Sequence, residues 1–298
     1  MSFPSPNIAT SFHTHLEEYG HCDIVIDRMR GFPLREELKA LKGHLAESLP
    51  LIDPLFMTIP DEAPLLVRLS VDASSLIESY LALAAEEAQR PGQGQAICAF
   101  LFSHLPCEKL AGHLTRQLDL RIKTGKRVFF RFFDPRVMHH LPRLLQPAEM
   151  AQLLNGIDYW TYPHWSDRRI ALKAQDYGPQ PDKPAYVRMS LSSAQSASLQ
   201  EIETFNLALH TLWQEGYALD EKTEAALHAA LKTAHACGLS TKEDRATLAC
   251  HVISRSENIL RQPQWQRALN LVRERAFALR DVLEAAGIAL VSPAAQHE

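Results

Sequence analysis

The chain has 298 residues, of which 46% are hydrophobic, and this is enough to bury one large core or two smaller ones. Its formal net charge is −4 and its pI is about 6.4, so we expect neither nucleic acid nor an anionic membrane as a partner. The five cysteines include no closely spaced pair, which favours reduced, buried thiols. No signal peptide and no apolar run of the ~20 residues that span a membrane is visible, so we predict a cytoplasmic protein.

Strand-like and helix-like segments alternate through the N-terminal part of the chain. Continuous apolar runs predict buried strands, whereas apolar residues that recur every three or four positions predict helices. We predict strands at 22–27, 55–57, 65–69, 96–102, 118–123, 127–133, 157–162 and 169–174. We predict helices at 34–45, 74–90, 106–118, 135–145 and 147–154. The glycine within Thr124–Lys126 favours a tight hairpin between two of the strands.

An aromatic strand runs directly into a capped helix near the middle of the chain. Within the strand predicted at 127–133, only Arg131 interrupts the apolar residues that follow its start, and a charge there must be paired or lie at a sheet edge. Asp134 is the predicted N-cap of the next helix, because its carboxylate can accept orphan N–H groups. Pro135 suits the first helical position, because it has no N–H to leave unsatisfied.

The helix predicted at 135–145 sorts its side chains into two faces. The apolar side chains expected to face the core are Val137, Leu141, Leu144 and Leu145. The basic side chains expected to face outward are Arg136, His139, His140 and Arg143. This basic face is a candidate docking surface, although charged faces are usually only solvated.

The C-terminal part of the chain has the pattern of a helical lobe. Residues 175–190 are rich in proline and glycine and are the predicted linker that precedes it. Helices are predicted from Ser192, Asp220, Ser240 and Pro263, and the serines open two capping-box patterns. Trp213 is predicted to be buried in the first helix, and the last is predicted to continue to Ala286.

These segments together predict the α+β class with two domains. The first, at 1–185, is an α/β lobe with a mixed β-sheet flanked by helices. The second, at 186–298, is an all-helical lobe. The boundary follows from the proline-rich linker.

The sequence Arg131-Phe-Phe-Asp-Pro-Arg-Val137, preceded by His113-Leu-Thr-Arg116, resembles the signature of the domain-of-unknown-function family 4123. Members of that family are adaptor chaperones of bacterial type VI secretion. The resemblance implies a non-enzymatic protein that binds a toxic effector and loads it onto the VgrG spike protein. It further implies that the α/β lobe recognises the C-terminal region of the spike and that the helical lobe recognises the effector.

The candidate partner-binding or motif residues are His113, Arg116, Arg127, Arg131, Asp134, Arg136, His140 and Arg143. Capping and ion pairing would also explain Asp134 and Arg136 as structural residues. We expect no metal and no cofactor, because the histidines and cysteines lack the spacing of a ligand set. We expect no catalytic residues either, because no nucleophile motif is present.

Two other functional classes also fit the sequence. A small hydrolase or transferase would need acids and histidines from separate segments to converge in a pocket, which spacing alone does not exclude. A regulatory interaction module outside secretion would have the same lack of catalytic motifs. The presence of a spike gene and a toxin gene beside this one would separate the adaptor from that module.

Overall fold

The computed structural model describes residues 12–41, 45–122, 127–166, 169–178, 189–275 and 277–288. The chain divides into two compact units, Met1–Gln89 with Gly94–Ala197 and Arg90–Gln93 with Ser198–Glu298. All the described strands belong to the first unit, and the regular structure described in the second is helical. The predicted α+β class is therefore confirmed. The predicted boundary between residues 185 and 186 lies outside the described residues.

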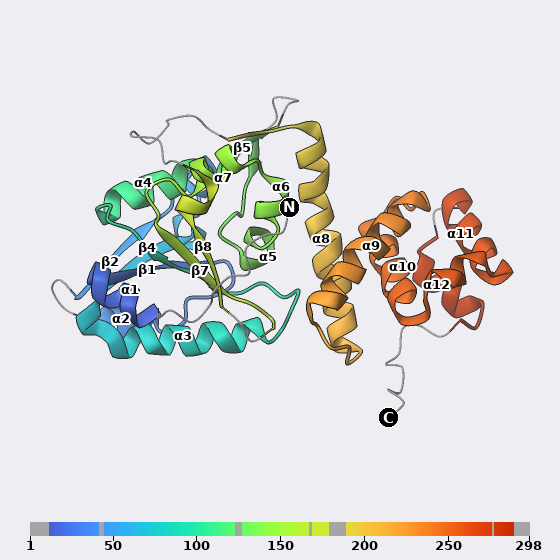
Figure 1. Ribbon diagram of the computed structural model, residues 1–298, viewed down its shortest axis with the longest axis horizontal. Coiled ribbons are helices and arrows are strands. Elements are labelled where there is room, and N and C mark those ends of the chain that lie inside the picture. The colour runs from blue at the N-terminus through green and yellow to red at the C-terminus, as the bar shows by residue number, and fades with distance from the viewer. Residues whose placement is uncertain are drawn as a thin grey trace. The chain divides into compact units, whose positions relative to one another are not determined.

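A six-stranded sheet forms the centre of the first unit, with the order β2-β3-β1-β4-β7-β8 (Figure 1). Its strands are β1 His21–Ile26, β2 Ala46–Pro50, β3 Leu65–Ser70, β4 Ile97–Phe102, β7 Tyr159–Pro163 and β8 Arg169–Lys173. Every neighbouring pair in this sheet is antiparallel. β4 is buried along its whole length, as its unbroken apolar sequence predicts.

A smaller three-stranded sheet has the order β6-β5-β9. Its strands are β5 Asp119–Ile122, β6 Arg127–Phe129 and β9 Ser190–Leu191. β5 and β6 are antiparallel, which confirms the predicted pairing of these two strands, and β5 and β9 are parallel. The mixed pairing is therefore found in the smaller sheet. The turn predicted at Thr124–Lys126 lies outside the described residues.

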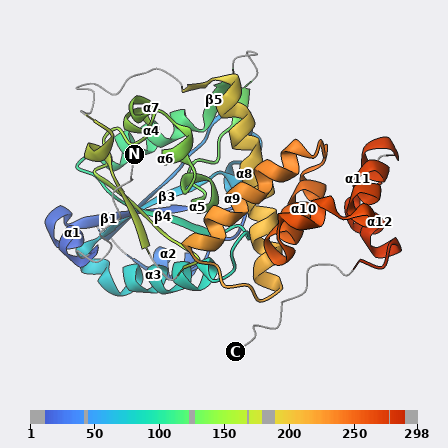
Figure 2. The ribbon, with the colours of Figure 1, turned by 45° about the vertical axis from the view of Figure 1, so that its right-hand side comes forward.

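Helices cover both faces of the large sheet. Figures 1 and 2 show α3 and α4 on opposite sides of it. α3 contributes Ile77, Tyr80, Leu81 and Ala84 to a core cluster with alternate residues of β1 and β3, as the helical spacing predicts. The helices of this unit are α1 Phe12–Tyr19, α2 Arg35–Ala40, α3 Ser74–Ala88, α4 Cys107–Gln117, α5 Pro135–Met138, α6 Leu141–Leu144 and α7 Pro147–Leu153. Short 3-10 turns are η2 Pro54–Phe56, η3 Pro60–Glu62, η4 Val71–Ala73 and η5 Ala174–Tyr177.

Three predictions for the first unit are wrong. The strand at 55–57 is replaced by η2, and the helix at 34–45 ends at Ala40, before β2. The aromatic strand ends at Phe129, because the following residues turn back through a hydrogen bond from the Asp134 N–H to the Arg131 carbonyl oxygen, 3.0 Å.

The single helix predicted at 135–145 is also wrong, because the structure contains two short helices there. α5 ends at Met138, and α6 begins with Pro142 in its first turn. A proline has no N–H to donate, and its ring clashes with the carbonyl group four residues earlier, which here belongs to Met138. The break therefore follows from Pro142.

The second unit contains most of α8 Ser193–Gln214, whose first five residues belong to the first unit, and the helices α9 Glu221–Ala236, α10 Lys242–Arg255, α11 Pro263–Arg275 and α12 Leu279–Ala285, with the 3-10 helix η6 Glu257–Arg261. The capping box at α8 is confirmed, because the Ser192 Oγ accepts the Gln195 N–H at 3.2 Å and the Gln195 Oε1 accepts the Ser192 N–H at 2.9 Å. The second capping box is wrong by one residue, because Thr241 caps α10.

The helix predicted from Pro263 to Ala286 is interrupted before Leu279. The buried carboxylate of Asp244 accepts the Leu279 N–H at 2.6 Å and so satisfies a donor at the start of α12. Trp213 is 37% exposed, so the prediction that it is buried is wrong. Within the residues that the structure describes, no helix is both long and apolar enough to cross a membrane.

Candidate functional site

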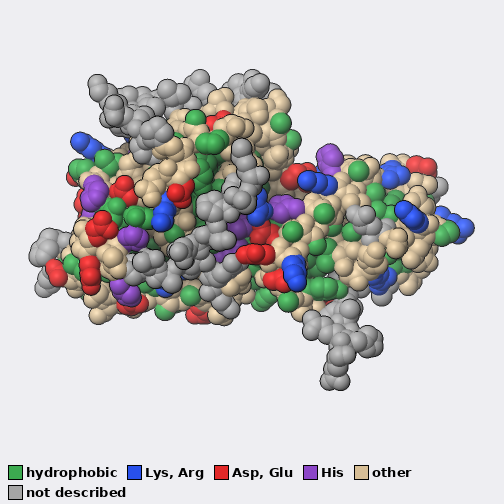
Figure 3. Space-filling model, viewed as in Figure 1, with side chains coloured by type: hydrophobic (Ala, Val, Ile, Leu, Met, Phe, Trp, Pro, Cys, Tyr) green, Lys and Arg blue, Asp and Glu red, His purple; other side chains and the backbone are tan. Residues whose placement is uncertain are grey.

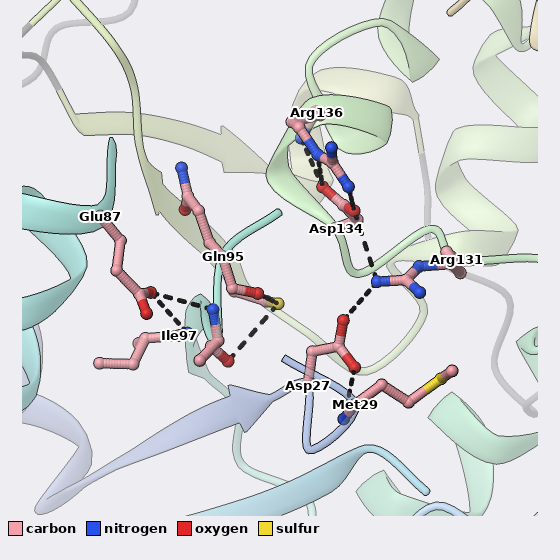
Figure 4. A network of polar contacts seen from close by, with 10 residues as sticks. Asp27, Met29, Glu87, Gln95, Ile97, Arg131, Asp134 and Arg136 are labelled. Atoms are coloured by element: carbon pink, nitrogen blue, oxygen red, sulfur yellow. Dashed lines mark hydrogen bonds and ion pairs between the residues drawn. The ribbon is translucent and has the colours of Figure 1, made fainter. Parts of the chain in front are cut away.

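The predicted motif forms a compact ionic cluster at the start of α5 (Figure 4). Asp134 is buried and caps α5, because its Oδ1 accepts the Arg136 N–H at 3.0 Å. The Arg136 side chain folds back onto the same carboxylate, with Nε 3.0 Å from Oδ1 and Nη2 2.6 Å from Oδ2. The predicted cap is therefore confirmed, and Arg136 pairs with the capping residue itself.

Arg131 links this cluster to the large sheet. Its Nη2 donates to Oδ2 of Asp27, which directly follows β1, and lies 3.7 Å from Oδ2 of Asp134. Asp27 is buried, and its other oxygen accepts the Met29 N–H at 3.2 Å. The motif turn and the end of β1, which are 104 residues apart in the sequence, are therefore held together by one guanidinium group.

The charges of this cluster balance, with two carboxylates and two guanidinium groups. Burial raises the pKa of Asp27 above its ordinary value; Arg131 opposes this shift and Asp134 adds to it. Removing one partner of such a buried pair costs about 3–5 kcal/mol, because the other charge is left without compensation. The arrangement is suited to fixing the position of the motif turn on the sheet.

A second anchor lies beside this cluster. Oε2 of Glu87, near the end of α3, accepts the N–H groups of Ala96 and Ile97 at 3.0 and 2.9 Å (Figure 4). The Ala96 carbonyl oxygen in turn accepts the Asp27 N–H at 2.8 Å. These bonds fix the start of β4 against the end of β1, where Arg131 binds.

The other predicted site residues lie on separate elements. His113 is buried in α4, where its Nε2 lies 2.9 Å from the Leu153 carbonyl oxygen, and burial lowers its pKa. Arg127 is paired through two nitrogens with Asp119, at 2.8 and 2.6 Å. Arg116 is partly buried in α4, His140 is buried between α5 and α6, and Arg143 is exposed on α6.

The predicted outward basic face is therefore wrong at Arg136 and His140, whereas Arg143 is exposed as predicted. Arg136 has only 18% of its side chain exposed and is paired with Asp134, and His140 is 5% exposed. Val137, which was expected in the core, is only partly buried. The prediction fails there because α5 ends at Met138 and α6 begins at Leu141, so these residues do not lie on one continuous helix.

Sequence reasoning missed a second buried ion pair. Asp23 of β1 and Arg68 of β3 lie opposite each other in the sheet and form two hydrogen bonds, of 2.8 and 2.7 Å. Asp23 is completely buried, and 17% of the Arg68 side chain is exposed. A signal was present, because the apolar strand predicted at 22–27 has an acidic residue in its interior, Asp23, and the one predicted at 65–69 has a basic residue, Arg68. Glu87 left no such signal, because it lies among the polar residues of α3.

The fold and the cluster define an α+β domain whose central sheet is tied by ion pairs to a Phe-rich turn. Residues 24–152 match the model of the family described as "Domain of unknown function (DUF4123)". The matched segment contains Asp27, Arg131, Asp134 and Arg136, so the whole ionic cluster lies within the part of the chain that is similar to this family. No curated protein and no solved structure matches the chain.

Proposed function

We propose that this chain is a non-enzymatic adaptor of a bacterial type VI secretion system, which binds a toxic effector and loads it onto a VgrG-type spike protein in the cytoplasm. The observation that carries the proposal is the family match at 24–152, which includes the motif from Arg131 to Arg136. In this proposal the first unit binds the C-terminal region of the spike. The helical unit binds the effector.

The contacts of the motif support a structural role for it within the proposed adaptor. The Asp134 carboxylate is engaged by the backbone N–H of Arg136 and by two side-chain nitrogens of the same residue. Asp27 is engaged by Arg131 and by a backbone N–H. Carboxylates that are held in this way stabilise the fold of the first unit. We therefore assign the partner contacts to other surfaces of this unit.

The test uses the full chain with a spike protein and an effector from the same bacterium, each purified separately. We expect the chain to bind each partner in isothermal titration calorimetry, and all three to co-elute in size-exclusion chromatography. The spike and the effector should elute apart when the chain is omitted. If the chain fails to bind the spike protein, or fails to bind the effector, the proposed function is refuted.

A further inference from the structure

The large sheet has two end strands, β2 and β8 (Figure 1), and the residues along their outer edges differ. In an antiparallel ladder, the backbone groups of alternate residues point toward the neighbouring strand and those of the residues between them point away. The Ala174 N–H donates to the Asp158 carbonyl oxygen at 3.1 Å, which sets this alternation for β8. Ile170 and Leu172 therefore bond to β7, whereas Arg169, Ala171 and Lys173 face the open edge.

The outer edge of β8 carries a row of outward-facing backbone groups. Among the residues that the structure describes, none donates to or accepts from the outward-facing groups of Arg169 and Ala171, or binds the Lys173 N–H. Such a row is a template for the backbone of another extended segment. β8 offers it over a strand that contains no proline.

The edge of β2 is protected in a way that the edge of β8 is not. The Leu51 N–H donates to the Pro64 carbonyl oxygen at 2.7 Å, so Ser48 and Pro50 are outward-facing positions of β2. Pro50 has no N–H to offer an incoming strand, and proline on an edge strand is a common means of preventing edge-to-edge pairing. The sheet is therefore open to strand addition mainly at β8.

The side chains of β8 indicate the chemistry of the segment that would fit. Arg169 lies over the ring of Phe12, and Lys173 lies over the ring of Tyr159, at 5.6 and 5.9 Å, so both cations lie on the sheet face that carries α1. Ile170 and Leu172 lie on the opposite face. An added strand would place alternate side chains beside these two sets, which favours acidic residues alternating with apolar ones.

We propose that the open edge of β8 binds an extended segment of the spike protein, with alternating acidic and apolar side chains, as a seventh strand of the sheet. This inference rests on the proposed adaptor function and adds the mode of binding. The backbone row would supply affinity, and the charge of Arg169 and Lys173 would favour an acidic segment and fix its register.

Hydrogen exchange of the wild-type chain tests the proposal without any substitution. On addition of the spike protein, exchange of the Ala171 amide should slow by about tenfold or more, because a free edge amide becomes a ladder donor. The outward amide of Ser48 on β2 is the internal control and should not change. Protection of Ala171 by the effector alone, or by raising the concentration of the chain itself, would instead assign the edge to another occupant and overturn the proposal.

Two variants and a matched control test, through the affinity for the spike protein, whether the outer edge of β8 binds the spike segment. Ala171→Pro removes one outward donor and should weaken spike binding by about tenfold or more, whereas Ser48→Pro makes the same change on the opposite edge and should leave it unchanged. If circular dichroism shows that Ala171→Pro is unfolded, the charge reversal Arg169→Glu with Lys173→Glu takes its place, and the same loss is expected, decreasing as salt rises.

The outcomes separate this inference from the proposed function. If the wild-type chain binds no spike protein, both are refuted. If it binds the spike, but the Ala171 amide stays unprotected and a folded edge variant binds with wild-type affinity, the adaptor function stands and only the β8 edge is refuted.

Discussion

Replacing Asp134 by alanine would remove two interactions at once. The first is the cap on the Arg136 N–H, whose loss costs about 1 kcal/mol at a helix N-terminus. The second is the carboxylate that pairs with Arg136 and lies 3.7 Å from Arg131. Breaking a fully buried pair costs about 3–5 kcal/mol, but these arginine side chains are 18% and 25% exposed, so water partly compensates them. We expect a total loss of about 2–4 kcal/mol.

Thermal unfolding followed by circular dichroism measures this loss. In a unit of this size, each kcal/mol lowers Tm by about 2–4 °C, so Asp134→Ala should lower the melting temperature of the first unit by roughly 5–15 °C. Asp134→Asn is the matched control. Its side-chain oxygen can still cap α5, but it lacks the charge, so it should lose less than the alanine variant.

A melting temperature of Asp134→Ala within about 2 °C of wild type would refute this reasoning, because the cap alone should produce a shift of that order. If the asparagine variant were as unstable as the alanine variant, the cap would contribute little and the ion pairs would carry the whole effect. The two variants thus separate the two interactions at one position.

Further predictions concern other charged groups. Asp23→Ala should lower the stability of the first unit by about 3–5 kcal/mol in chemical denaturation, because it leaves Arg68 without its buried partner. Arg127→Ala breaks a pair of the same geometry with Asp119, but 47% of the Arg127 side chain is exposed, so the loss of stability should be clearly smaller than at Asp23; equal losses at the two sites would contradict the role given to burial. Burial lowers the pKa of His251 in α10 to about 4, so protonation favours the unfolded state. The helical unit should be less stable as pH falls from 6.5 toward 4, and His251→Phe should reduce this dependence in melting curves recorded at both ends of the range; an unchanged dependence would exclude His251 as its source.

Local patterns were sufficient for elements whose stability depends on their own sequence. The apolar runs of β1, β3 and β4 and the helical repeat of α3 could be predicted because each buried face appears directly as a period along the chain. The cap at Asp134 and the capping box at Ser192 are also local, since donor and acceptor lie within three residues of each other.

The elements that were missed depend on distant residues. β2 has an exposed, polar sequence and is a strand only because it pairs with β3. The start of α12 is satisfied by Asp244, 35 residues earlier, and the partner of Arg131 is 104 residues away. A pattern that is read in a short window contains no information on such contacts. Pro142 is different, because the break it causes was visible in the sequence and was overlooked.

The internal balance of the ionic cluster also bears on where recognition takes place. Figure 3 shows acidic and basic side chains interspersed over the face in view, and the motif charges neutralise each other within the domain. Side chains that are paired in this way offer a partner little net charge. The motif is therefore better suited to stabilising the domain than to contacting a partner. In our proposal, recognition therefore falls to backbone groups at β8, which lies after the segment that matches the family. The matched segment would then stabilise the sheet, and the outer edge of β8 would bind the spike segment. The backbone groups of β8 would select a segment in extended conformation, and the side chains of Arg169 and Lys173 would select an acidic one.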